Sequence, residues 1–250
     1  MGNVDLTFIG SGNAFSPGGL CCNGFLINRR FLFDAPPQSL SSLATVGMDP
    51  NEIETLVISH HHGDHFLGLP FLLLHWRWKG RTRPMRIIGP PGTEALGKDI
   101  AEKVFPGVMS GASYDLEWQE ARPGSPLLLN GLELEPHLMT HDEGLEMCLG
   151  YGIRIGSRRI GYTGDTILCD SVLDLARTSE ILVSECASRD GRIPVHMNLL
   201  DDMPVVRAAM KPDAQLILTH ISPDVDTNGM KNTQVAKDFQ TYSFPHVVRM

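Results

Sequence analysis

Short apolar runs bounded by glycine, proline and polar residues recur through the first hundred positions of the chain. Such runs are typical of strands, and they cover Val4–Ile9, Gly24–Ile27, Phe31–Asp34, Thr55–Ile58 and Arg86–Ile88. Segments in which apolar residues recur every three or four positions predict helices at Ser39–Val46, Phe66–Trp78 and Gly92–Val104. This part of the chain therefore predicts a sheet with helices packed against it.

The same order recurs after about residue 110. Strand-like runs cover Leu132–Met139, Cys148–Ile155, Arg158–Tyr162, Ile181–Val183 and Gln215–Leu218. Helical spacing covers Leu168–Arg177 and Asn198–Met210. The chain has 250 residues, of which 42% are hydrophobic, so it can bury a large core. We expect one α/β domain over residues 1–250, made of two packed halves that share a cleft.

Charge and cysteine content narrow the range of partners. The formal net charge of −8 disfavours a surface built to collect nucleic-acid phosphates. Five cysteines, an odd number, form no disulfide framework and favour a reducing cytoplasm. The first residues resemble a strand and not a signal peptide, and the longest apolar stretch, Leu67–Leu74, is too short to cross a bilayer. We expect a cytoplasmic protein that does not bind membranes.

A dense group of metal-binding side chains follows the predicted strand Thr55–Ile58. The run Ser59-His60-His61-His62-Gly63-Asp64-His65 places four candidate ligands within six residues, namely His60, His62, Asp64 and His65. Imidazole and carboxylate donors without paired cysteines indicate an open, catalytic site for zinc, manganese or iron. We expect Gly63 to give the backbone a sharp turn between the two pairs of ligands.

The order His-x-His-x-Asp-His after a buried strand resembles the signature of the metallo-β-lactamase superfamily. The resemblance implies a four-layered αββα sandwich and three further ligands. On this comparison His141, at the end of a strand, is the third histidine, and His137 on the same strand is its competitor. Asp165, which alone would be interpreted as a helix cap, resembles the bridging aspartate, and His220 resembles the last ligand.

The resemblance implies a site for two divalent ions, with zinc as the first choice and manganese or iron as alternatives. His60, His62 and His141 would hold one ion, Asp165 would bridge both, and the second would be held by Asp64, His65 and His220. Two such ions activate a bridging water and stabilise charge on attacking and leaving oxygens, which suits phosphodiester hydrolysis. Asp64 is also expected to orient the attacking hydroxide.

Peripheral motifs indicate a branch of the superfamily. Leu6-Thr7-Phe8-Ile9-Gly10-Ser11-Gly12, Ile88-Gly89-Pro90-Pro91-Gly92 and Leu149-Gly150-Tyr151 resemble ribonuclease Z and related small-molecule phosphodiesterases, some of which act on cyclic phosphates. By that resemblance Glu185 orients His196, and His196 protonates the leaving oxygen; the alternative is a strand-end carboxylate and a histidine that begins a helix. Ser184-Glu185-Cys186-Ala187 and His196-Met197-Asn198 depart from the ribonuclease motifs, and the chain lacks the long arm that grips tRNA.

A small or cyclic phosphodiester is therefore the expected substrate, and RNA is the weaker expectation. The alternatives are tRNA 3′ processing, lactone or thioester hydrolysis, and di-iron redox chemistry. The branch implies a homodimer. A basic, aromatic patch beside the cleft is one interpretation of Trp76, Trp78, His75, Arg77, Arg81, Arg83 and Arg86, but a packed helix followed by a solvated turn is preferred. The segment Pro106–Leu127 predicts either a lid or a contact between copies.

Overall fold

Two seven-stranded sheets form the centre of the protein in the computed structural model, which describes residues 3–191 and 193–245. The first sheet has the order β14-β1-β2-β3-β4-β5-β6, with β1 Val4–Gly10, β2 Gly24–Ile27, β3 Phe31–Phe33, β4 Thr55–Val57, β5 Met85–Gly89, β6 Leu116–Glu120 and β14 Thr241–Phe244. The second has the order β13-β12-β11-β10-β9-β8-β7, with β7 Leu127–Leu129, β8 Leu132–Met139, β9 Cys148–Ile155, β10 Arg158–Tyr162, β11 Ile181–Glu185, β12 Gln215–Thr219 and β13 Thr233–Val235.

The two sheets pack face to face through alternate residues of their strands. In β2, Phe25 and Ile27 enter the core between the sheets, while Leu26 points to the other face. Tyr151 and Ile153 of β9 meet them from the second sheet. Both faces of the inner strands are buried, because helices cover the outer faces. This explains why these strands appear in the sequence as continuous apolar runs.

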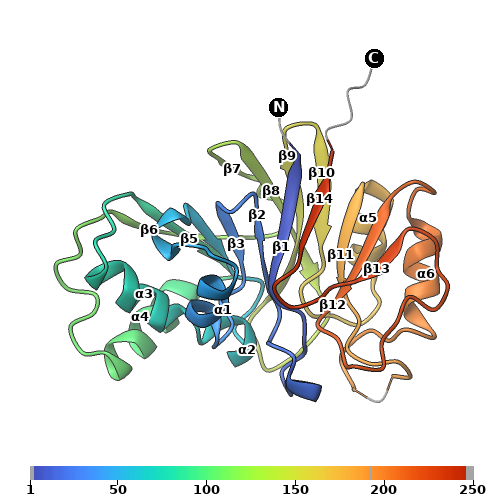
Figure 1. Ribbon diagram of the computed structural model, residues 1–250, viewed down its shortest axis with the longest axis horizontal. Helices are drawn as coiled ribbons and strands as arrows, with labels where there is room; N and C mark the ends of the chain where they lie inside the picture. Colours follow the sequence, from blue (N-terminus) through green and yellow to red (C-terminus); the bar gives the residue numbers. More distant parts are fainter. Residues whose placement is uncertain (1–2, 192, 246–250) are drawn as a thin grey trace.

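Helices form the two outer layers. On the first sheet lie α1 (Ser39–Thr45), α3 (Leu69–Trp78) and α4 (Thr93–Val104), and on the second lie α5 (Asp170–Thr178) and α6 (Asp202–Ala209). Figure 1 shows α3 and α4 on one side of the paired sheets and α5 and α6 on the other. The layers are thus helix, sheet, sheet, helix, and the predicted αββα architecture is confirmed.

Two predicted helices differ most from expectation at their starts. The helix expected from Phe66 is divided into α2 (Gly63–Phe66) and α3, and at their junction Gly68 passes so close to the backbone of Pro36 that no side chain fits there. The helix expected from Asn198 begins at Asp202, because the side-chain oxygen of Asn198 accepts hydrogen bonds from the amides of Leu200 and Asp201.

Four short strands were not predicted, namely β6, β7, β13 and β14. Within the segment Pro106–Leu127, interpreted from sequence as a lid or a contact between copies, Leu116–Glu120 pairs with β5 as the edge strand β6. The one-turn helices η1 (Pro17–Gly19) and η2 (Pro50–Glu52) lie in the connections between strands. Within the described ranges, every helix is too short or too polar to cross a membrane.

Candidate metal centre

The candidate ligands collect at one edge of the sandwich because four strands end there. Strands β3 to β6 run parallel to one another, as do β10 to β13, and β8 runs the same way as β10 through two antiparallel pairings with β9. The turn after β4 carries the histidine-rich run, and His141, Asp165 and His220 follow β8, β10 and β12. Residues far apart in sequence therefore meet at the carboxyl ends of strands from both sheets.

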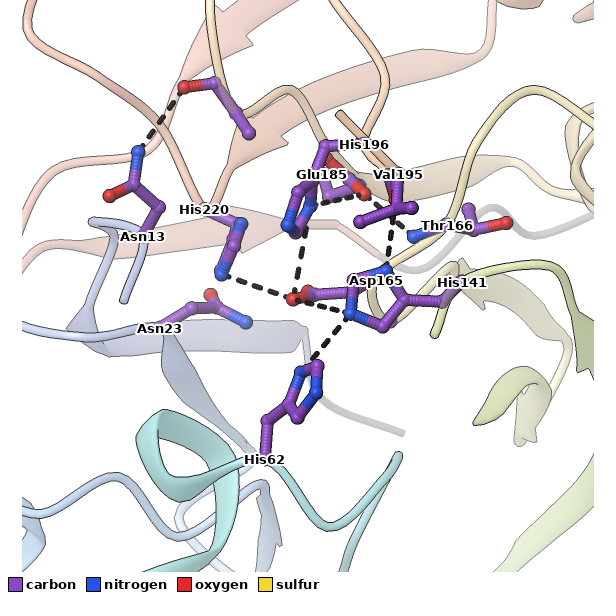
Figure 2. Close-up of polar contacts among 12 residues, drawn as sticks. Asn13, Asn23, His62, His141, Asp165, Thr166, Glu185, Val195, His196 and His220 are labelled. Atoms are coloured by element: carbon purple, nitrogen blue, oxygen red, sulfur yellow. Dashed lines mark hydrogen bonds and ion pairs between the residues drawn. The ribbon is translucent and has the colours of Figure 1, made fainter. Parts of the chain in front are cut away.

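Three histidines form the first group. Ring nitrogens of His60, His62 and His141 all lie within 4.8 Å of one another. The Nε2 atom of His141 lies 3.1 Å from Nδ1 of His62, a contact drawn in Figure 2. His60 is fully buried and His62 is partly exposed. Three imidazoles that converge in this way could hold a metal ion.

Two carboxylates and two histidines form the second group, which comprises Asp64, His65, Asp165 and His220. The Nε2 atoms of His65 and His220 each lie 3.2 Å from Oδ2 of Asp165 and 3.2 Å from Oδ2 of Asp64. Asp64 and His65 belong to α2, so the first turn of this short helix brings both into the site. Mixed oxygen and nitrogen donors of this kind suit zinc, manganese or iron.

Asp165 lies between the two groups. Its Oδ2 is 3.8 Å from Nε2 of His60 and 3.9 Å from Nε2 of His141, in addition to the two shorter contacts in the second group. Oδ1 of Asp165 and Nε2 of both His60 and His65 are buried and have no hydrogen-bond partner. Buried polar atoms without partners are rare and costly, and bound cations would satisfy all three. The cluster therefore fits the kind of metal site that is typical of this fold.

The charges of the cluster also favour cations. Burial lowers the pKa of His60 well below its usual range and lowers that of His141. Burial acts in the same direction on His65, but the nearby carboxylates of Asp165, Asp64 and Asp34 outweigh it and raise the pKa of His65 well above its usual range. The carboxylates thus gather negative charge around His65, which a divalent ion at the cluster would neutralise.

Four of these histidines have their outer ring nitrogen fixed. Nδ1 of His60 lies 3.0 Å from Oγ of Ser59, Nε2 of His62 lies 3.0 Å from Oδ2 of Asp142, and Nδ1 of His65 lies 2.8 Å from Oδ2 of Asp34. The Nδ1 atom of His141 donates to the backbone carbonyl of Val195 at 2.9 Å. Such partners select the tautomer and hold the other nitrogen toward the centre of the site.

Asp34 connects the two sheets beneath the cluster. Its side chain is fully buried and accepts hydrogen bonds from the amide and the hydroxyl of Ser59 at 2.7 and 2.9 Å. It also accepts one from His65 and one from the hydroxyl of Tyr162 at 2.5 Å. Ser59 follows β4 of the first sheet and Tyr162 ends β10 of the second, so this carboxylate positions a candidate ligand against both sheets.

Glu185 and His196 form a pair beside the second group. Nδ1 of His196 lies 3.0 Å from Oε1 of Glu185, which also accepts the amide of Thr166 at 2.6 Å. The His196 ring stacks on His220 with centroids 5.1 Å apart. Burial acts to lower the pKa of His196, but the hydrogen bond and the charge of Glu185 outweigh it and raise this pKa to about 9. Figure 2 shows the pair facing Asp165.

A cavity of about 580 Å³ adjoins His141. Its wall includes apolar side chains of Ile167 and Val195. Three carboxylates also line it, those of Asp142, Glu143 and Glu146, and neither lysine nor arginine is among the described residues of its lining. The space next to the cluster is therefore partly apolar and acidic.

The alternatives considered from sequence fall elsewhere. His137 lies on β8 opposite Gly150, among Glu133, Glu135 and the end of α5, and contributes to none of the groups of close ligand atoms found among the described residues. Asp165 does not cap α5, whose N-cap residue is Cys169.

Two further expectations need correction. Gly63 begins α2 without a positive φ, so it does not provide the unusual turn that was expected. In the stretch after α3, Arg81 is buried and not solvated: it donates to the carbonyls of Asn51, Ile53, Arg83 and Pro84, and its guanidinium lies over Trp76. It is therefore not available to a ligand.

Sequence reasoning missed Asp34, Asp142 and Val195. Asp34 carried a signal, since a carboxylate directly after the apolar run Phe31-Leu32-Phe33 is either costly or functional. Asp142 directly follows His141, but nothing in the sequence shows that it reaches His62. Val195 acts through its backbone, which gives no compositional signal.

Comparison with known proteins agrees with this geometry. A ribonuclease Z of Methanothermobacter thermautotrophicus is 24% identical over 86% of this chain and 83% of its own length. The metallo-β-lactamase-fold protein YhfI of Bacillus subtilis superposes with a TM-score of 0.77 at 21% identity, covering 96% of this chain and 99% of its own. A diphosphatase of the PhnP family gives a TM-score of 0.74 at 22% identity, covering 96% and 98%.

These similarities identify a ribonuclease Z-like member of the metallo-β-lactamase superfamily. The family described as anti-Pycsar protein Apyc1 matches residues 4–242, which include both ligand groups and the pair Glu185 and His196. With nearly the whole chain matched, the protein belongs to the anti-Pycsar protein Apyc1 family.

Proposed function

We propose that the protein hydrolyses a small or cyclic phosphodiester with the help of two divalent cations. The observation that carries the proposal is the assembly of seven side chains, from four strand ends, into two groups that share one carboxylate. The first cation would be held by His60, His62 and His141, the second by Asp64, His65 and His220, and Asp165 would contact both.

The cations, when bound, would activate a water shared between them and neutralise the charge that develops on the phosphoryl oxygens. The chain itself contributes the positions of the donors. Asp34, Ser59 and Asp142 hold three of the imidazoles by their outer nitrogens. Asp64, which lies at the second group and is partly exposed, is placed to accept a hydrogen bond from the attacking water.

His196 is the proposed proton donor to the leaving oxygen. Its Nδ1 is bound to Glu185, and Nε2 is left to donate. An alkoxide leaves poorly unless it is protonated, so the donor matters for substrates with alkyl or ribose leaving groups. Glu185 is held in turn by the amide of Thr166, which fixes the orientation of the pair.

The surroundings of the site favour a small substrate over RNA. The cavity beside His141 presents Asp142, Glu143 and Glu146, and these carboxylates repel the further phosphates of a polynucleotide. Its apolar wall suits the uncharged part of a small phosphodiester. Processing of tRNA 3′ ends remains the alternative, because the chain is similar to ribonucleases Z over most of its length. The two proposed activities, hydrolysis of a small phosphodiester and cleavage of a tRNA precursor, differ in the size of the substrate.

We further propose zinc as the metal, a homodimer as the assembly and the cytoplasm as the location. Imidazole and carboxylate donors support zinc. The five cysteines all lie among the described residues and are free, which suits a reducing compartment. Exposed apolar side chains at Leu67, just before α3, and at Phe71, within it, support a contact with a second copy.

The decisive test compares His137, which lies on β8, with His141, which lies in the turn after β8. Metal-analysed parent protein, His141→Ala and His137→Ala are assayed with bis(p-nitrophenyl) phosphate, cyclic nucleotides and a tRNA precursor, after loading with zinc, manganese or iron. We expect His141→Ala to bind less metal and to lose at least roughly 100-fold in kcat/KM, because loss of a ligand should cost more than loss of a residue that only hydrogen-bonds to a ligand. His137→Ala should behave like the parent.

The outcomes separate the alternatives. Turnover of cyclic nucleotides but not of the tRNA precursor supports the small phosphodiester, and the reverse supports the ribonuclease. Absence of turnover by the parent under every metal loading would refute phosphodiester hydrolysis. Equal effects of the two substitutions would refute the assignment of His141.

A further inference from the structure

Val195 has an unusual backbone conformation next to the metal centre. Its φ is +60°, in the left-handed region. Glycine, asparagine, aspartate and histidine account for most residues there, whereas a β-branched side chain is a true outlier because its Cβ crowds the backbone. Asp34 and His220 also have positive φ, but they belong to the tolerant types. Strained conformations of this kind persist where surrounding structure enforces them, and they cluster at functional sites.

The conformation gives the Val195 carbonyl a specific partner. The carbonyl accepts the Nδ1–H of His141 at 2.9 Å, as Figure 2 shows. Nδ1 of His141 is therefore protonated, and Nε2 carries the lone pair that faces Nδ1 of His62 at 3.1 Å. Rotation of the peptide plane after residue 195 would remove this acceptor from a ring that is otherwise buried.

The next residue in the chain is His196, the proposed proton donor. Its Nδ1 meets Glu185 at 3.0 Å, and its ring packs against His141 with centroids 4.8 Å apart. The peptide unit that joins Val195 to His196 therefore contacts a candidate ligand on one side and leads directly to the proton donor on the other. The outer nitrogens of His60, His62 and His65 are held by side chains instead.

We propose that Val195 is a positioning residue: its left-handed backbone, and not the side chain that it contributes to the cavity wall, orients His141 and His196. The backbone aims one carbonyl at His141, which fixes the tautomer that binds metal, and it places His196 against Glu185. Metal affinity at the first group and proton donation thus depend on the same peptide unit. The inference rests on the proposed function, since it takes His141 as a ligand and His196 as the donor.

Substitutions at position 195 separate backbone from side chain. V195G and V195N remove the valine side chain but favour φ near +60°, whereas V195P fixes φ near −65° and excludes it. We expect V195G and V195N to bind both metals with affinity within about twofold of the parent. V195P should lose roughly 10- to 100-fold in affinity for one of its two metals, which is the range typical when a hydrogen-bond partner of a metal ligand is lost.

The readouts extend beyond activity. Metal affinity is measured by competition with a chromophoric chelator, and the cobalt-loaded proteins are compared by their visible absorption, which reports the ligand geometry. The pH profile of kcat with an alkyl leaving group reports His196. Far-ultraviolet circular dichroism of each metal-free variant shows whether it is folded. A loss of affinity in V195G and V195N equal to that in V195P, or no loss in a folded V195P, overturns the proposal.

A measurement on the intact backbone covers the case in which V195P does not fold. Valine followed by histidine occurs only once in the sequence, at residues 195 and 196. Labelling valine carbonyls with ¹³C and histidine amides with ¹⁵N therefore selects this single peptide bond in NMR spectra. We expect the carbonyl resonance to shift upfield in His141→Gln, which removes the ring donor, and to stay in place in the control His137→Gln. The same shift in both, or in neither, overturns the proposal.

This experiment also keeps the two proposals apart. It is performed on metal-free and on zinc-loaded protein and does not require turnover. A hydrogen-bonded Val195 carbonyl in a protein without hydrolytic activity would leave the backbone contact standing and refute the proposed function. Hydrolysis by a protein whose Val195 carbonyl resonance does not change in His141→Gln would refute the backbone contact and leave the proposed function standing.

Discussion

The hydrogen bond between Glu185 and His196 sets the pH range over which the proposed proton donor keeps its proton. Burial opposes a charge on His196, but the hydrogen bond and the negative charge of Glu185 outweigh it and raise the pKa to about 9. The acid form of His196 is therefore present below this pH and is lost as the pH rises through it. An ordinary histidine would already be neutral at pH 7.5.

We therefore predict an alkaline limb in the activity. With an alkyl phosphodiester, kcat of the parent should fall above about pH 9, and His196→Asn should be lower by roughly 100-fold at neutral pH and lack this limb. With bis(p-nitrophenyl) phosphate the difference should shrink, because p-nitrophenolate leaves without a proton. The measurement is kcat against pH for both substrates, with His137→Asn as the control. An unchanged alkaline limb in His196→Asn would contradict the role.

At the scale of residues, the sequence predicted the side chains that the structure brings together into one cluster. His60, His62, Asp64 and His65 form a local pattern, and their proximity follows from spacing alone. His141 and the more distant candidates were named by resemblance, and the structure brings them together. Contacts made by backbone atoms, such as the Val195 carbonyl, depend on torsion angles that the type of residue does not specify.

At the scale of elements, the junction between α2 and α3 is fixed by a close approach of two backbones. A Cβ on Gly68 would overlap the carbonyl oxygen of Pro36 and lie 2.6 Å from Oγ of Ser39 at the start of α1. The amide of Gly68 also donates to the carbonyl of Ala35 at 2.8 Å. Ala35 and Pro36 precede α1 closely, and Ser39 begins it. Because Gly68 packs against these residues, α3 cannot move away without disturbing α1.

Gly68→Ala should therefore destabilise the protein by roughly 1–3 kcal/mol, the range typical of overpacking. Gly63→Ala provides the matched control, since its Cβ would meet only the flexible end of Leu67 at 3.0 Å and its φ is not positive. The measurement is the free energy of unfolding in urea of the metal-free proteins. Equal stability of the two variants would show that the packing at Gly68 is looser than the structure indicates.

The elements that the sequence predicted are those buried on both faces or strongly amphipathic. Strands β1 to β4 appear as apolar runs because helices cover one face and the second sheet the other. Strand β6 was missed because it is an edge strand, and its sequence Leu-Glu-Trp-Gln-Glu is mostly polar. The pairing of the carboxyl-terminal strand β14 with β1 involves residues more than 230 positions apart, as in Val4 opposite Phe244, and no local pattern encodes it.

At the scale of the whole molecule, the candidate ligands connect the two sheets. One group of donors follows β4 in the first sheet, and the others follow β8, β10 and β12 in the second. A cation bound by both sets binds the folded chain better than the unfolded one and so stabilises it. We also propose that the described residues unfold as one cooperative domain, because a continuous core fills the space between the sheets.

Metal removal should lower the stability of the chain as a unit. Zinc at about a thousand times its Kd should add about 4 kcal/mol to the free energy of unfolding, and EDTA should remove it. Thermal unfolding followed by tryptophan fluorescence reports the first half, which holds all three tryptophans, and circular dichroism reports the whole. The two transitions should coincide with and without EDTA. Separate transitions would argue for two domains, and no response to EDTA would argue against cations at the cluster.

The cavity beside His141 and the ligand groups are built from different kinds of segment. The ligands come from turns that are anchored by four strands and by the buried Asp34, whereas the three carboxylates of the cavity wall come from one exposed turn, residues 142–146. Asp142 also contacts Nε2 of His62, so it is at Glu143 and Glu146 that the charge of the cavity wall could change without removing a partner of a candidate ligand. In the proposed hydrolase, substitutions at Glu143 and Glu146 would therefore change which substrates fit before they changed the catalytic centre.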